Sequence, residues 1–188
     1  MKKTLFSLAI AALFSIGATT TASAQTKAKT VMVGGAPMYP TKNIVENAVN
    51  SKDHTTLVTA LKAAGLVETL QGAGPFTVFA PTNEAFNKLP AGTVETLVKP
   101  ENKATLTKIL TYHVVAGRMT AADLTKAIKA GKGSATLKTV SGGTLTAMAK
   151  GKTIMLKDEK GGVSTVTIAD VMQSNGVIHV VNTVLMPQ

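Results

Sequence analysis

Cysteine and tryptophan are absent from this chain of 188 residues, and aromatic residues make up only 4% of it. Without cysteine the chain has no disulfide, no thiolate metal site and no cysteine nucleophile, so side-chain packing alone must stabilise the fold. The lysines are spread along the sequence, and Arg118 is the only arginine. Because nucleic-acid-binding proteins usually combine clustered basic residues with aromatic rings for base stacking, this composition argues against a nucleic-acid partner.

The motifs of common enzymes are missing as well. No Gly-x-Ser-x-Gly nucleophile elbow occurs. The paired acids Asp158-Glu159 lie in a glycine-flanked segment, where we expect them to solvate a turn. Residues 131–134, Gly-Lys-Gly-Ser, resemble a phosphate loop but lack the Walker spacing and follow a predicted helix. The methionines show no metal-binding spacing, and core filling explains them. The sequence therefore predicts neither an enzyme nor a cofactor or metal site.

The first 24 residues have the pattern of a secretory signal peptide. A basic start is followed by an apolar run over residues 5–17 and by Ala22-Ser23-Ala24, a small-residue cleavage site. Cleavage would lower the formal net charge from +10 to +8 by removing Lys2 and Lys3. No later segment has an apolar run long enough for a membrane span. We expect an exported protein, periplasmic or extracellular. Its lysines either attract it to anionic surfaces or simply keep it soluble.

The stretch at residues 74–86, Gly-Pro-Phe-Thr-Val-Phe-Ala-Pro-Thr-Asn-Glu-Ala-Phe, predicts a short buried strand that leads into a helix. Pro81 ends the strand because it has no amide hydrogen for the sheet. Thr82 or Asn83 can then cap the helix, and Glu84 would lie in its first turn, where the helix dipole favours negative charge.

The pattern along the chain predicts an α+β fold. Residues 25–40 have the composition of an arm or linker, and helical patterns follow from residue 43 to residue 110. Asn43 with Glu46, and Thr120 with Asp123, match capping boxes. The last third contains alternating runs separated by glycine-rich turns, which predicts successive hairpins. They lie at residues 135–140, 144–149, 153–157, 163–168 and 177–186.

Three motifs in order give the chain a family resemblance. Residues 74–86 resemble the first signature of the fasciclin (FAS1) domain, an adhesion and matrix module. Residues 109–115, Ile-Leu-Thr-Tyr-His-Val-Val, resemble its Tyr-His motif, and residues 175–187 resemble its second signature. The resemblance implies a FAS1 domain over residues 41–188, with a β wedge or sandwich of mostly antiparallel strands flanked by several short helices.

Six residues are candidate site or motif residues: Tyr112, His113, His179, Thr82, Asn83 and Asn182. His113 and His179 lie in apolar runs that we interpret as strands, where a buried imidazole needs hydrogen-bond partners, so we expect structural roles. The resemblance also implies that they stabilise the fold. Thr82, Asn83 and Asn182 belong to the motifs. The family commonly has Asp at the two Asn positions, so the change removes a charge but keeps a side-chain acceptor. His54, near a helix start, is expected to lie at the surface or to cap the helix.

Tyr112 and His113 are the candidate binding residues, because the family's Tyr-His region is implicated in integrin binding in animal relatives. If residues 112–115 form a strand, only one side chain of this pair can point inward. The other could then contact a partner, although two residues do not carry integrin recognition over to this chain.

Three functions stay open at this point. The first is a non-enzymatic, secreted adhesion or interaction module that binds a cell-surface protein, a matrix protein or a polysaccharide. The second is a periplasmic carrier of a small ligand, which would need an apolar pocket larger than about 300 Å³ between helices and sheet. The third, an enzyme, has no visible arrangement of nucleophile and base.

Overall fold

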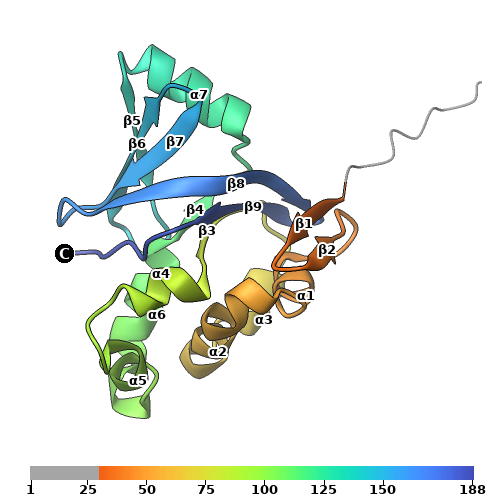
Figure 1. Cartoon of the computed structure of the whole chain (residues 1–188), viewed down its shortest axis with the longest axis vertical. Coiled ribbons are helices and arrows are strands. Elements are labelled where there is room, and N and C mark those ends of the chain that lie inside the picture. The colour runs from red at the N-terminus through yellow and green to blue at the C-terminus, as the bar shows by residue number, and fades with distance from the viewer. Residues whose placement is uncertain (1–29) are drawn as a thin grey trace, which may run out of the picture.

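The computed structural model describes residues 30–188, so the predicted signal peptide lies outside the described residues. Seven strands form one sheet in the order β4-β3-β9-β8-β7-β6-β5, with helices at both of its ends (Figure 1). The strands are β3 (Phe76–Pro81), β4 (Val114–Ala116), β5 (Ser134–Lys138), β6 (Thr144–Lys150), β7 (Thr153–Lys157), β8 (Val163–Gln173) and β9 (Gly176–Val181).

The strand pairing confirms the predicted mostly antiparallel α+β fold. All neighbours in this sheet pair antiparallel except β3 and β9, which run parallel from Phe76↔Gly176 to Pro81↔Val181. The two end strands also meet, because Val140 N donates to Val114 O at 2.8 Å beside a bridge from Val115 to Thr139. This contact covers part of two strand edges that would otherwise have unpaired backbone groups.

Strand β8 is longer than the sequence pattern predicted, because it continues past Ile168 to Gln173. Its pairing with β9 shifts register twice, between Val166 and Ile168 and again before Val171, and Asp170 has a left-handed φ of 57°. Such bulges break the simple alternation of side chains and bend a strand. The bent strand pairs with β7 in its first half and with β9 along most of its length.

Most of the helices cover the lower part of the molecule, and α7 alone covers the upper part (Figure 1). They are α1 (Ile44–Ala48), η1 (Lys52–His54), α2 (Thr55–Ala64), α3 (Val67–Gln71), α4 (Asn83–Asn87), α5 (Thr93–Leu97), η2 (Pro100–Asn102), α6 (Lys103–Tyr112) and α7 (Ala121–Ala130). Both predicted capping boxes, Asn43 with Glu46 and Thr120 with Asp123, are present. None of the helices within residues 30–188 has the length and apolar character needed to cross a membrane.

The described part of the segment expected as an arm forms a hairpin on the domain. Strands β1 (Val31–Val33) and β2 (Ala36–Met38) pair antiparallel. Val33 and Met38 are buried in the larger core, whereas Tyr39 stays 43% exposed.

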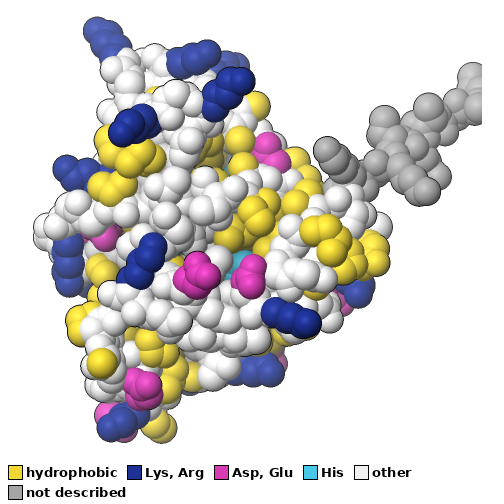
Figure 2. Space-filling model, in the orientation of Figure 1, with side chains coloured by type: hydrophobic (Ala, Val, Ile, Leu, Met, Phe, Trp, Pro, Cys, Tyr) yellow, Lys and Arg dark blue, Asp and Glu magenta, His cyan; other side chains and the backbone are white. Residues whose placement is uncertain are grey.

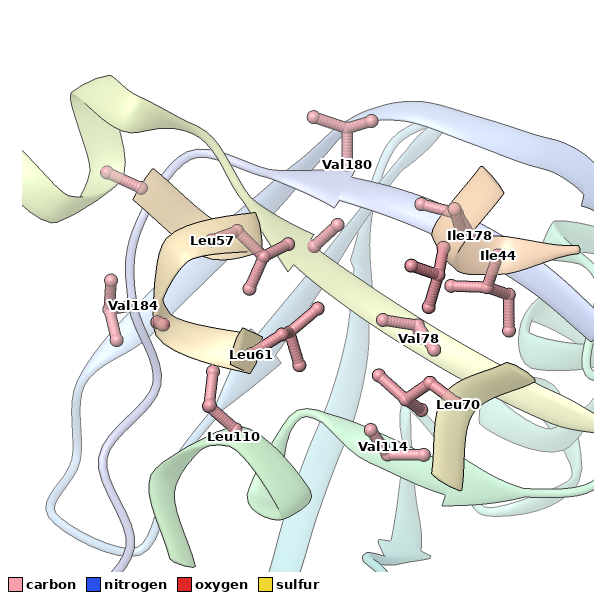
Figure 3. Close-up of a cluster of buried hydrophobic side chains, with 14 of the residues drawn as sticks. Ile44, Leu57, Leu61, Leu70, Val78, Leu110, Val114, Ile178, Val180 and Val184 are labelled. Atoms are coloured by element: carbon pink, nitrogen blue, oxygen red, sulfur yellow. The ribbon is translucent and has the colours of Figure 1, made fainter. Parts of the chain in front are cut away.

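Two hydrophobic cores share the sheet. In the larger one, Leu57 and Leu61 of α2 and Leu110 of α6 lie over Val78 of β3 and Ile178 of β9 (Figure 3). The smaller one lies between α7 and the hairpins β5–β7, and contains Leu124, Ile128, Leu137, Leu145 and Leu156. We call α7 with the hairpins as far as Val163, residues 121–163, the α7 lobe.

One local expectation was wrong, and one turn differs from the geometry usual for its residues. Residues 112–115 are not a continuous strand, because α6 ends at Tyr112, His113 is its C-cap and β4 begins at Val114. The turn between β8 and β9 consists of Ser174 and Asn175, and neither Asn175 nor Gly176 has a left-handed φ. Gly176 is needed for a different reason: a Cβ there would lie 2.2 Å from the carbonyl oxygen of Phe76 on the parallel neighbour.

Candidate functional site

Tyr112, one of the two candidate binding residues, lies wholly inside the smaller core. Its hydroxyl donates to Thr144 O at 2.6 Å and accepts from Glu159 N at 3.1 Å. Burial disfavours the phenolate and raises the pKa of Tyr112 to about 12. The hydroxyl thus joins α6 to β6 and to the turn after β7, and the side chain offers no surface to a partner.

His113, the other candidate binding residue, is buried beside it because the helix end turns both side chains inward. Its Nδ1–H donates to Ile109 O at 2.9 Å, and its Nε2 accepts from Leu185 N at 3.0 Å. These partners fix one neutral tautomer. Burial lowers the pKa of His113 to about 4. The binding role of the pair stays a prediction, and it would require the helix end to open.

His179 is fully buried on β9 and lies stacked on Phe79, with ring centroids 5.7 Å apart. Its Nε2–H donates to Met119 O at 2.8 Å, and its Nδ1 accepts from Asp170 N at 3.3 Å. Burial lowers the pKa of His179 below its usual range. The imidazole therefore holds the segment before α7 and the bulge of β8 against β9.

His54 is buried, so the expectation of a surface position was wrong. It is the last residue of η1 and holds the N-cap position of α2, but its side chain makes no capping hydrogen bond. Its Nδ1 hydrogen-bonds Ser51 Oγ at 2.9 Å, and its Nε2 is the one buried side-chain polar atom in residues 30–188 with no hydrogen-bond partner. Burial lowers the pKa of His54. His54 and His113 both line an apolar cavity of about 30 Å³ in the larger core.

That cavity is the internal space between helices and sheet, where a carrier would hold its ligand. Its volume is roughly that of a single water molecule, far below the ~300 Å³ of ordinary ligand pockets. Across residues 30–188, no group of three or more His, Cys, Asp or Glu side chains could hold a metal ion.

The sequence left open whether Thr82 or Asn83 caps the helix that follows β3. Thr82 is the N-cap of α4, and its Oγ1 accepts from Ala85 N at 3.3 Å. The side chain of Asn83 instead links α4 to η1 and α2: its Oδ1 accepts from Thr56 N at 3.0 Å and its Nδ2 donates to Lys52 O at 2.8 Å. An aspartate could accept from Thr56 but could not donate to Lys52, so asparagine makes one bond that aspartate cannot.

Asn182 connects the end of β9 to β8. Its Oδ1 accepts from Thr165 N at 2.9 Å, and its backbone carbonyl accepts from Lys88 Nζ at 2.6 Å. Like Asn83, it serves the fold through hydrogen bonds to backbone groups.

The sequence pattern did not indicate that Asn47, Gln173 and Asn175 are buried, and it predicted the wrong environment for Asp158. Asn47 and Gln173 hydrogen-bond each other in the interior, and Asn175 Oδ1 accepts from Ile44 N at 3.1 Å. An asparagine among the apolar residues of a helix face was the available signal for Asn47. Asp158 was expected at a solvated turn, but it is buried, and its Oδ2 accepts from Met186 N at 2.9 Å.

The outer surface has two features that stand apart from this interior network. Met32, 58% exposed, and Tyr39 both belong to the β1–β2 hairpin region. Figure 2 shows Lys and Arg side chains gathered over the upper part of the molecule, where Figure 1 places the α7 lobe.

Comparisons with known proteins agree with the architecture. A family model described as "Fasciclin domain" matches residues 52–187. Protein sll1483 of Synechocystis sp. is 46% identical over 178 residues, which cover 93% of this chain and 91% of that protein. Immunogenic protein MPB70 of Mycobacterium bovis is 37% identical over 145 residues, covering 74% of this chain and 66% of that protein. The solved FAS1 domain pair of the insect cell adhesion molecule Fasciclin I shares the fold, with a TM-score of 0.68 at 19% identity, over 77% of this chain and 51% of that one.

Proposed function

The chain belongs to the fasciclin domain family, and from that premise we propose that it is a non-enzymatic, exported adhesion or interaction module. Its partner is a component of the cell surface or matrix, either a protein or a polysaccharide. Two relatives support this reading by their names. Fasciclin I is a cell adhesion molecule. The MPB83 protein of Mycobacterium bovis, 36% identical over 148 residues, is a cell surface glycolipoprotein.

The observation that carries the proposal is that the polar groups of the three motif residues Tyr112, His113 and His179 are engaged in holding the fold. Both ring nitrogens of His113 and of His179 hydrogen-bond backbone groups, and so does the hydroxyl of Tyr112. A general base or nucleophile needs a reactive atom within reach of a substrate. These atoms are buried and already bonded, so recognition falls to the outer surface.

The carrier alternative receives no support from the cavity, whose 30 Å³ cannot enclose a metabolite. Export rests on the leader at residues 1–24, whose basic start, apolar run and small-residue cleavage site favour secretion. We therefore assign the mature protein to the periplasm or the cell exterior, as residues 25–188.

A binding isotherm on intact cells tests the proposal. Labelled mature protein should bind to cells of the source organism, or to its extracted surface material, in a saturable way that unlabelled protein competes away. A Tyr112→Phe variant should bind equally well, because the hydroxyl is turned into the core. Absence of saturable binding to cells and extracts would refute the adhesion module. Weaker binding by a fully folded Tyr112→Phe variant would place the Tyr-His pair in the interface after all.

A further inference from the structure

Positive charge in the described chain is concentrated in the α7 lobe. Residues 121–163 contain eight lysines and three acidic residues, a formal net charge of +5, whereas the other described residues together have a net charge of +1. The concentration is not visible along the sequence, because the lysines come from one helix, three strands and three turns.

Four exposed lysines share one end of the lobe, and we call them the lysine tip. Ser134 pairs with Met148 at the last position of the β5–β6 ladder, so the turn that contains Lys132, just before β5, lies at the same end of the sheet as Lys150, which ends β6. The four are Lys129, Lys132, Lys150 and Lys152. Lys152 lies in the turn that follows Lys150, and Lys132 N donates to Lys129 O at 3.1 Å, which brings the end of α7 to the same place.

The three acids of the lobe do not neutralise the tip. Asp123 lies in the first turn of α7, where it forms the capping box with Thr120 and lies near Lys126, which is not part of the tip. Asp158 is buried, and Glu159 accepts from Thr144 N at 2.8 Å at the far end of β6. No acidic residue occurs between Leu124 and Lys157.

The backbone at the tip also departs from the ordinary. Lys132 has a left-handed φ of 55°, a conformation that costs a lysine free energy and that asparagine or glycine adopts more readily. Gly131 before it is fixed by close packing, since a Cβ there would lie 1.9 Å from Ser134 O. The turn thus holds a charged side chain at a position where the fold alone would favour a different residue.

We infer that the lysine tip is a docking site for an acidic polysaccharide, a chain that carries carboxylate or sulfate groups at repeated intervals. This assignment rests on the proposed function and names the partner and surface for it. Separate lysines are compact point charges that suit anions spaced along a flexible chain. From Lys129 of the tip, a shallow and open surface hollow runs back along α7 to its first turn, lined also by Ala121, Ala122, Thr125 and Lys126.

Two other anionic partners fit less well. Single-stranded nucleic acid is held largely by base stacking on aromatic rings, and no aromatic residue follows Tyr112 in the sequence. A membrane surface usually receives apolar side chains between the lipid headgroups as well as basic ones. The large apolar side chains that are exposed, Met32, Tyr39, Val49, Val140 and Val163, all lie outside the tip.

The test compares two triple variants of the mature protein that have the same net charge. Lys132→Gln/Lys150→Gln/Lys152→Gln changes the tip, and Lys62→Gln/Lys99→Gln/Lys103→Gln changes three exposed lysines outside the lobe. Binding to heparin and to alginate, as sulfated and carboxylated probes, is measured by titration at low and at physiological salt. Dextran, anionic phosphatidylglycerol vesicles and duplex DNA serve as comparison ligands, and circular dichroism checks folding.

The tip variant should lose on the order of tenfold to a hundredfold in affinity for at least one acidic polysaccharide, because each lysine near a polyanion contributes a few-fold. The control variant should stay within about threefold of wild type, and added salt should weaken the wild type. Equal losses in the two variants, no binding to either acidic polysaccharide, or tighter binding to vesicles or DNA would each overturn the site. Cell binding retained by the tip variant would refute the tip alone, whereas no cell binding by wild type would refute the adhesion module itself.

Discussion

The imidazole of His113 joins the end of α6 to the C-terminal segment, because its Nε2 accepts the backbone N–H of Leu185 at 3.0 Å, 72 residues further along the chain. The carbonyl of His113 also accepts from Phe79 N at 2.9 Å on β3. One residue thus connects a helix end, a central strand and the segment that follows β9. A buried polar residue with all its partners present specifies an arrangement that apolar packing alone would leave less defined.

Replacing this histidine should cost stability without touching the outer surface. His113→Ala leaves the Leu185 N–H and the Ile109 carbonyl without side-chain partners, and we expect a loss of about 2–4 kcal/mol in the free energy of unfolding. Urea unfolding followed by circular dichroism measures it. His54→Ala is the matched control: it loses only the Nδ1 bond to Ser51 Oγ, because Nε2 has no partner, so its cost should be smaller. A His113→Ala variant as stable as wild type would contradict the structural role.

Lowering the pH should destabilise the fold over a pH range that is set by the pKa values of the buried histidines. The pKa values of His54, His113 and His179 are all lowered by burial, that of His113 to about 4. Between the ordinary histidine value and the lowered one, the unfolded chain binds more protons than the native protein, so stability falls as the pH falls. Each histidine contributes up to about 1.4 kcal/mol per pH unit in its own window.

Urea unfolding at several pH values between 7.5 and 5 checks this dependence, in a range where ordinary carboxylates stay ionised. A His54→Asn variant should show a shallower slope than wild type. A stability that does not change over this range would mean that the imidazoles are charged, or exposed, in the native state.

Much of the fold follows from local chemistry that is readable in the sequence. The caps at Asn43, Thr82 and Thr120 came from residue type and spacing, and the structure has each of them. The hairpins of the last third came from alternation and turn residues. The end of α6 could not be predicted in this way, since Tyr-His-Val-Val has the apolar and β-branched character of a strand. Its helical geometry depends on partners at Thr144, Glu159 and Leu185, which no local pattern reveals.

The candidate site was less predictable, for the same physical reason. Lys132 and Lys150 are 18 positions apart in the sequence, and only the register of β5 and β6 places them together. A register follows from pairing across the sheet, so a scan along the chain finds scattered lysines. The family resemblance made Tyr112 and His113 candidate binding residues, but their burial depends on the whole domain.

The Tyr112 hydroxyl should contribute to stability through its two backbone partners. Tyr112→Phe keeps the ring but removes the bonds to Thr144 O and Glu159 N, and we expect a loss of about 1–2 kcal/mol. Tyr39→Phe is the matched control at an exposed tyrosine and should change stability by less than about 0.5 kcal/mol. Thermal and urea unfolding of both variants give the comparison. Equal effects would argue against the buried hydroxyl as a link.

Replacing Gly176 with alanine, which has the smallest side chain, should already destabilise the fold. An alanine Cβ would lie 2.2 Å from the Phe76 carbonyl oxygen and 3.1 Å from Ile44 Cδ1, and the backbone atom cannot move without separating β3 from β9. Gly176→Ala should therefore cost about 1–3 kcal/mol or more, by the overpacking of a tight interior. Gly72→Ala is a milder control, since its Cβ would approach Thr69 O at 3.1 Å. Similar stabilities of the two variants would show that the parallel pair separates easily.

Lys132 offers a substitution that should raise stability while it removes charge from the lysine tip. Asparagine tolerates the left-handed φ of 55° better than lysine does, so Lys132→Asn should stabilise the native state by about 0.5–1 kcal/mol. Lys129→Asn, in the last turn of α7, is the matched control. It should lose a few tenths of a kcal/mol, because asparagine is a poorer helix former and a positive charge there favours the helix dipole.

Urea unfolding separates these two outcomes, and titration with heparin gives the binding side of the same experiment. If Lys132→Asn is more stable than wild type but binds heparin more weakly, destabilisation cannot explain the loss of affinity. The loss would then come from the missing ammonium group. If Lys132→Asn instead destabilises the protein as much as Lys129→Asn, the lysine side chain must make a stabilising contact that outweighs its unfavourable backbone. The presence of a lysine at this left-handed position would then be explained by its role in the fold, without a ligand.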